Sequence, residues 1–323
     1  MKFLSDYFNS GTVKQQNRKR FGALLICITA ALLAVALIAL MIASIATAVK
    51  RKSPQAEEPE DTAGSGIPSG YTTTTFDQAQ LSSGNLLLID ETHTYTGTPT
   101  VVLMNSTRPA DTASGEYLYW MYDTVNFALT EDALAAFHQL VTDFHAESGD
   151  NNLYVKDAFN QSSATQASAL HQTGTALTLL YYTYEGSTDE KPTGKQSIYN
   201  VDTYKWLYDH AHEYGFIQAS SAEGEENIFR YVGVAHASYM KNNSKTLAEY
   251  LDILQTRTAS RPLSVQVTVK NADGQSTSVT YNIYRLTSEE TPVVPAKFSY
   301  TVSGDNMGGY IVTVDRSSAT ANP

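Results

Sequence analysis

Cysteine is nearly absent from this sequence of 323 residues. The one cysteine, Cys27, has no partner, so no disulfide can form within the chain and no Cys-x-x-Cys metal motif exists. A disulfide-stapled scaffold is therefore excluded. The length allows two compact modules, and a chain of this size can bury a sizeable core without covalent cross-links.

Charge is absent from residues 21–49, a run rich in Leu, Ala and Ile. It exceeds the roughly 20 apolar residues that span a hydrocarbon core about 30 Å thick. A cleaved signal peptide is the alternative, with small residues at 43–48 as the cleavage site, but its apolar core would be only about 7–15 residues long. We therefore predict a transmembrane helix over 21–49 that stays in the mature protein.

Basic residues flank this run on both sides, with five Lys or Arg in residues 1–20 and a second cluster at Lys50, Arg51 and Lys52. The larger cluster favours a cytoplasmic N-terminal tail over residues 1–20. The predicted localisation is the cell membrane, with a single pass, a cytoplasmic N-terminus and most of the chain extracellular.

Positive charge is scarce in the outer part. Residues 53–323 carry 14 Lys or Arg against 32 Asp or Glu, a formal charge of −18. Such a surface repels phosphate polymers, which excludes nucleic acid as an expected partner.

Residues 50–75 have no apolar periodicity and contain Pro, Gly and acidic residues, so we predict a flexible linker there. The last residues, 317–323, are predicted to form a disordered tail. Between these ends we expect a main domain over 76–258 and a β-rich extension over 259–316.

Apolar periodicity places the elements of the main domain. Leu134, Phe137, Leu140, Val141 and Phe144 recur at helical spacing and predict a helix over 131–147. The remaining expectations for this domain are strands over 86–89, 175–184 and 229–235, and helices over 161–170, from 202 to 214, and over 246–251.

The extension has a different pattern. Residues 263–269 and 279–286 alternate with period two, and the segment between them contains the turn pair Asp273-Gly274. Two more strands are expected over 298–303 and 310–314. Whether this extension folds alone or packs on the main domain is left open by the sequence.

Two motifs carry a resemblance to a known family. The segment from Ala169 to Thr178, with His171 and Gly174, resembles the pattern SxHxxGxAxD of the VanY-like D-alanyl-D-alanine carboxypeptidases. The segment from Asn227 to Gly233 resembles the EPWHWRYVG segment of the same zinc peptidases. Matching segments occur in the expected order over about residues 80–255. The resemblance implies an α+β fold with helices on one side of a small, mainly antiparallel sheet, and a site in the open groove of that sheet.

In the family, two histidines and an aspartate hold the metal. The first histidine falls on His171, the aspartate on Thr178 and the second histidine on Ile228. The family's general base falls on Glu225, and its arginine that meets the substrate carboxylate falls near Phe159 and Asn160, where this chain has no arginine. We therefore expect a cleft lined by His171, Thr178, Ile228 and Asn160, with His171 as the one residual metal ligand.

A catalytic zinc needs about three protein ligands, so no cofactor is expected unless residues from elsewhere rebuild the site for zinc. The favoured hypothesis is a membrane-anchored pseudo-peptidase, impaired in catalysis, that binds cell-wall peptide or a protein partner. The alternatives are an active zinc D-alanyl-D-alanine carboxypeptidase that trims peptidoglycan stem peptides, with Glu225 as the base, and an adhesion module in which the cleft plays no part.

Overall fold

The computed structural model describes residues 67–104, 120–122, 124–184, 192–219, 227–270 and 275–319. The chain divides into two units, Met1–Gly64 and Ser65–Pro323, and all described residues belong to the second. The predicted cytoplasmic tail, transmembrane helix and Glu225 lie outside the described residues. Within the described ranges, no helix is both long and apolar enough to cross a bilayer.

A mixed but mainly antiparallel sheet forms the centre of the main domain. Only the β3–β5 pair is parallel among its described strands. Along the sheet the order is β3 (Trp120–Tyr122), β5 (Leu153–Asp157), β7 (Ala176–Tyr184), β10 (Ile228–Tyr231) and β9 (Phe216–Gln218), with β8 (Pro192–Ser197) paired beside β7. A smaller sheet joins β2 (Val102–Leu103), β4 (Phe127–Leu129) and β6 (Phe159–Asn160).

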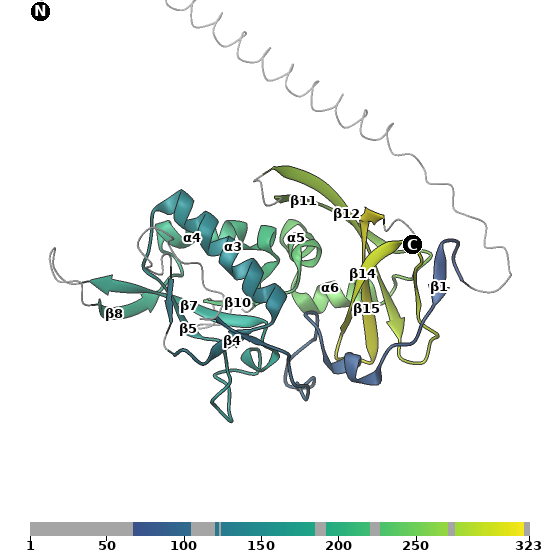
Figure 1. The fold of residues 1–323 in the computed structure, drawn as a ribbon, viewed down its shortest axis with the longest axis horizontal. Helices are drawn as coiled ribbons and strands as arrows, with labels where there is room; N and C mark the ends of the chain where they lie inside the picture. The colour runs from purple at the N-terminus through teal and green to yellow at the C-terminus, as the bar shows by residue number, and fades with distance from the viewer. Residues whose placement is uncertain are drawn as a thin grey trace, which may run out of the picture. The chain divides into compact units, whose positions relative to one another are not determined.

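Helices α3 (Glu131–Ser148) and α4 (Asp202–His210) lie on one face of this sheet (Figure 1). The apolar stripe of α3 enters the core together with Leu177, Leu179 and Phe229 from the strands. A short 3₁₀ helix, η4 (Ala211–Tyr214), continues α4 to Gly215. The α+β fold expected from the resemblance is confirmed.

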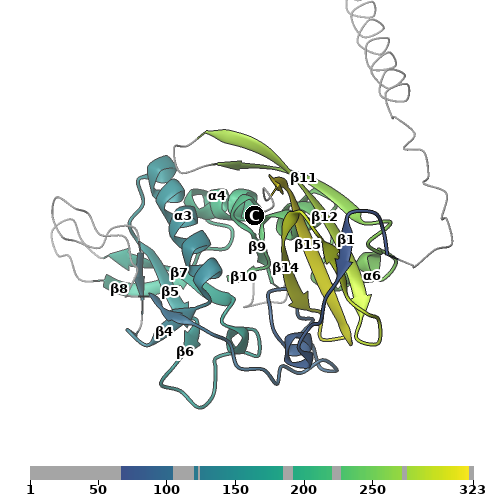
Figure 2. The ribbon, with the colours of Figure 1, turned by 45° about the vertical axis from the view of Figure 1, so that its right-hand side comes forward.

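The C-terminal extension forms a four-stranded antiparallel sheet. Its order is β11 (Leu263–Lys270), β12 (Ser276–Thr287), β15 (Gly309–Ala319) and β14 (Phe298–Gly304). One face of this sheet shares a core with α5 (Val234–Asn242) and α6 (Leu247–Leu254), and Figure 2 shows these parts from a second angle. The question left open by the sequence is thus resolved, because the extension packs on the main domain.

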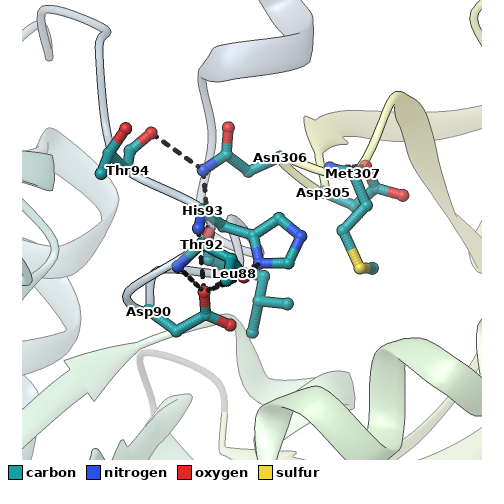
Figure 3. Close-up of polar contacts among 8 residues, drawn as sticks. All are labelled: Leu88, Asp90, Thr92, His93, Thr94, Asp305, Asn306 and Met307. Atoms are coloured by element: carbon teal, nitrogen blue, oxygen red, sulfur yellow. Dashed lines mark hydrogen bonds and ion pairs between the residues drawn. The ribbon is translucent and has the colours of Figure 1, made fainter.

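Polar contacts reinforce this shared core. The buried ring of His236 on α5 contacts the Tyr250 hydroxyl of α6 at 2.7 Å and the Thr313 hydroxyl of β15 at 2.9 Å. In the turn before β15, the Asn306 amide donates to the carbonyls of Leu88 and Thr94 (Figure 3). The extension is therefore tied to both the end and the beginning of the main domain.

Several predicted elements differ in the structure. Residues 161–170 form turns and bends, so the predicted helix is wrong. Residues 86–89 are outside any ladder, and the strand predicted over 229–235 ends at Tyr231, after which Val234 begins α5.

Both predicted flexible ends contain regular structure. The strand β1 (Tyr71–Thr73) lies within the predicted linker and pairs with β13 (Val293–Pro295). At the other end, β15 continues to Ala319, because its pairing with β14 extends to Phe298. The 3₁₀ helices η1 (Gln78–Ser82) and η3 (His171–Thr173) complete the described elements.

The buried His236 predicts an acid-sensitive fold. Burial lowers the pKa of His236 from 6.5 to about 3. Between pH 6.5 and 3, the imidazole is therefore protonated in the unfolded chain and neutral in the native protein. Stability should therefore be complete above pH 6.5 and fall as the pH drops toward 3, by up to about 1.4 kcal/mol per pH unit from this residue.

Denaturant unfolding of the full chain as a function of pH measures this dependence. The variant His236→Gln keeps an amide that can contact both hydroxyls but has no titratable ring, so its stability should depend less steeply on pH. If the free energy of unfolding depends on pH equally in both proteins, His236 is not the source of the acid sensitivity.

Candidate functional site

His171 stands where η3 meets β7. Gly174 ends η3 with φ of 69°, a left-handed conformation that glycine adopts without strain. A Cβ at Gly174 would also lie 2.6 Å from a methyl of Val101. Glycine therefore fixes the tight turn that aims His171 back at the strand that follows it.

The three positions that match the family's metal ligands meet in space. The Thr178 hydroxyl lies 3.1 Å from Nε2 of His171. Ile228 stands directly opposite Thr178 in the β7–β10 ladder, so the two side chains share one face of the sheet. That face is opposite the one that packs on α3 and α4, since the alternate residues Leu177 and Phe229 belong to the helix-side core.

Both ring nitrogens of His171 are engaged by hydroxyls. Nδ1 lies 2.8 Å from the Ser168 hydroxyl, and Nε2 faces Thr178. The residue is only 1% exposed, and burial together with the charge of Lys156 lowers its pKa from 6.5 to about 4. The ring is therefore neutral at neutral pH, with one nitrogen donating and the other accepting.

Sequence reasoning missed the role of Ser168. The family pattern places a serine two residues before the histidine, where this chain has Ala169. The structure supplies the hydroxyl from one residue earlier, because the backbone turns so that the amide of His171 bonds the carbonyl of Ser168. A serine three residues before a histidine at a helix start was the available signal.

Two neighbours of Thr178 were also missed. Asp157 opposes Thr178 from β5, after a bulge that follows Val155. Lys156 lies 3.6 Å from the Asp157 carboxylate and is half exposed. A carboxylate and an ammonium therefore border the His171–Thr178 pair.

Asn160 does not bond to His171. Its side chain accepts a hydrogen bond from the Ser162 amide at 3.0 Å, and its backbone bonds Gln166. It lies on β6, which contacts η3, and its side-chain amide shapes the adjoining turn. The structure thus brings together His171, Thr178 and Ile228, and leaves Asn160 in a structural role.

The donor set at the three family positions does not fit a catalytic zinc. Such a site uses three nitrogen, sulfur or carboxylate ligands and an open position for water. The chain offers one imidazole with both nitrogens already hydrogen-bonded, a neutral hydroxyl and an aliphatic side chain. Within the described ranges, no cluster of three or more His, Cys, Asp or Glu side chains could hold a metal ion.

Arg230 has a structural role. It is 2% exposed, and its guanidinium donates to the carbonyls of Leu87, at 2.7 Å, and Asn85. Burial lowers its pKa to about 10, which still leaves it charged at neutral pH. The segment 85–87 therefore lies against β10 without joining the sheet as a strand.

Comparison with known proteins agrees with this geometry. No protein-family model matches the chain. Over 126 residues the chain is 32% identical to a D-alanyl-D-alanine carboxypeptidase of Enterococcus faecium. The match covers 36% of this chain and 38% of the relative, so the chain spans less than half of that protein's length.

The fold has a solved counterpart. The crystal structure of the vancomycin-resistance D,D-dipeptidase VanXYg superposes with a TM-score of 0.51 at 17% identity, over 76% of this chain and 99% of that one. In part of its sequence and in its fold, the chain is similar to the VanY-like D,D-peptidases. By this resemblance, Thr178 and Ile228 fall at positions where the family pattern has metal ligands, and they face each other across the β7–β10 ladder.

Restoring those two positions should restore metal binding. In the double variant Thr178→Asp with Ile228→His, a carboxylate and an imidazole would converge on His171, so we expect zinc to remain bound in a one-to-one ratio after dialysis. The unaltered full chain should retain none. Metal content and the shift of the unfolding midpoint with added zinc measure the difference.

The matched control is Thr178→Asn with Ile228→Leu, which changes the same positions without adding strong zinc ligands. If the unaltered chain retains one zinc per molecule, the donor set described here is incomplete.

Proposed function

We propose that the cleft around His171 binds a cell-wall peptide without cleaving it. The observation that carries this proposal is the state of the His171 ring, which is buried, neutral and hydrogen-bonded on both nitrogens. A hydrolytic zinc would need one of those nitrogens and two further ligands. The chain instead places a hydroxyl and an isoleucine at the matching positions.

The ligand class follows from the relatives. The curated relative is named a D-alanyl-D-alanine carboxypeptidase, and the VanXYg structure contains a D-Ala-D-Ala phosphinate analogue. The bordering groups suit a peptide end, since Lys156 offers a half-exposed ammonium beside the Thr178 strand. The proposed ligand is thus a stem peptide that ends in D-Ala-D-Ala, and a protein segment with a similar C-terminus is the second choice.

The proposal includes a membrane-anchored location. The uncharged run over 21–49 would hold the domain at the outer surface of the cell membrane, where wall peptides lie. The strongly negative charge of residues 53–323 is compatible with that location and unfavourable for a nucleic-acid partner.

A second function is favoured by a separate observation. The chain is 32% identical over 126 residues to a curated carboxypeptidase. Glu225, which lies outside the described residues, is the position on which the resemblance places the general base. An active zinc enzyme with substituted ligands would hydrolyse the terminal D-alanine. Turnover separates this function from the binding role.

The test is titration calorimetry of the full chain with a pentapeptide ending in D-Ala-D-Ala, alongside an assay for released D-alanine. We expect saturable binding and no release, with or without added zinc. His171→Ala should weaken binding by about tenfold, since it opens a cavity and leaves the hydroxyls of Ser168 and Thr178 without their partner.

The matched control is His210→Ala. His210 stacks on Trp206 on the helix side of the sheet, so its loss should leave peptide affinity unchanged. Release of D-alanine that depends on zinc and on His171 would replace the binding role with the enzyme, and no binding at all would leave the cleft without a ligand of this class.

A further inference from the structure

A cavity lies on the opposite side of β10 from His171. It has a volume of about 330 Å³ and opens between β9, η4 and α5. Phe229 lines it, whereas its neighbours Ile228 and Arg230 face the other way, toward Thr178 and Leu87. Because side chains alternate along a strand, this cavity and the peptide cleft are separate sites.

The floor of the cavity is apolar. Phe216, Phe229 and Met240 line it, and each is at most 2% exposed. The volume equals that of about ten water molecules, and it falls at the lower end of the range for small-molecule sites. A compact hydrocarbon chain fits such a floor better than an extended polymer does.

The rim is cationic. Lys241 and Lys245 both line the cavity at the C-terminal end of α5. The Lys241 ammonium donates to the carbonyl of Tyr208 at 2.9 Å, which uses one of its three protons, and Lys245 lies 3.8 Å from Glu249. Burial lowers the pKa of His212, also in the lining, so its ring adds no positive charge at neutral pH.

Two ammonium groups over an apolar floor complement a ligand with a negative head and a hydrocarbon body. The pairing is specific here because the domain as a whole is acidic, with a charge of −18 over residues 53–323. The negative charge of the domain would repel an anionic ligand from most of its surface. At this rim the two lysines would attract the anionic head, and the apolar floor would bury the hydrocarbon chain.

We propose that this cavity binds a small carboxylic acid with an unbranched apolar chain, its carboxylate at Lys241 and Lys245 and its chain against Met240. The site goes beyond the peptide-binding role proposed above, and it can exist whether or not that role is correct.

The test uses hexanoate as the probe and the methyl group of Met240 as the reporter. In the full chain labelled with ¹³C at its methionine methyls, Met240→Leu identifies the Met240 signal. We expect hexanoate to shift this signal in a saturable manner and to leave the Met121 signal in place, since β3 lies at the opposite edge of the sheet from β9. Hexylamine should produce no shift, and hexan-1-ol should bind at least about tenfold more weakly than hexanoate, since it lacks the charge.

Charge variants complete the experiment. Lys241→Gln with Lys245→Gln should weaken hexanoate binding by about tenfold, the value expected for two partly exposed ion pairs. Lys205→Gln with Lys297→Gln removes the same charge from outside the cavity lining and should leave the affinity unchanged. An unmoved Met240 signal, equal affinity for hexanoate and hexan-1-ol, or equal loss in both double variants would each overturn the proposal.

Discussion

The hydrogen bonds that join the His171 imidazole to two hydroxyls determine what chemistry this buried site can do. His171 is 1% exposed, so a charge on its ring would be costly, and its pKa is lowered to about 4. A neutral ring between Ser168 and Thr178 satisfies both nitrogens without any ion. The same burial would penalise an aspartate at position 178 unless a cation stood beside it. Thr178 and Ile228 suit this burial because neither side chain carries a charge. No cation is then needed at the site to neutralise one.

The surroundings of the cleft hold this arrangement in place from both sides. Arg230 binds the carbonyl of Leu87 from the sheet, while the amides of Leu86 and Leu88 donate to Ser303 and to the Asp305 carbonyl of the extension. The segment 85–88 is therefore bonded on one side to the cleft's own strand and on the other to the β14–β15 turn. The extension stabilises a wall of the main domain, and the two share one apolar core.

Much of the fold could be predicted where a long apolar period exists. The helix expected over 131–147 and the strands expected at 263–269 and 279–286 are confirmed, because each buries one face over several repeats. The helix expected over 161–170 fails because no apolar stripe supports it, and the side chains of Asn160, Ser163 and Gln166 bond nearby backbone groups instead. The segment 86–89 is apolar enough for a strand, but the Leu87 carbonyl bonds a guanidinium, which no local pattern reveals.

The sequence predicted which residues form the candidate site, but it did not predict the neighbouring side chains that they contact. The resemblance to the family implied that His171, Thr178 and Ile228 lie together, and the β7–β10 register brings Thr178 and Ile228 face to face. It could not supply Ser168 or Asp157, since one depends on a turn and the other on a bulge in β5.

The alternation of β10 explains how the two faces can differ so much in function. Phe229 packs into the helix-side core with α3 and α4, and that packing stabilises the sheet whatever stands at its neighbours. Ile228 and Arg230 point to the other face, where Ile228 lies opposite Thr178 and Arg230 donates to backbone carbonyls. Substitutions on one face leave the packing of the other nearly unchanged, because effects at sites with no shared partners are close to additive. A strand with this period can therefore change the residues on one face and keep its core, which is compatible with a shared fold at 17% identity.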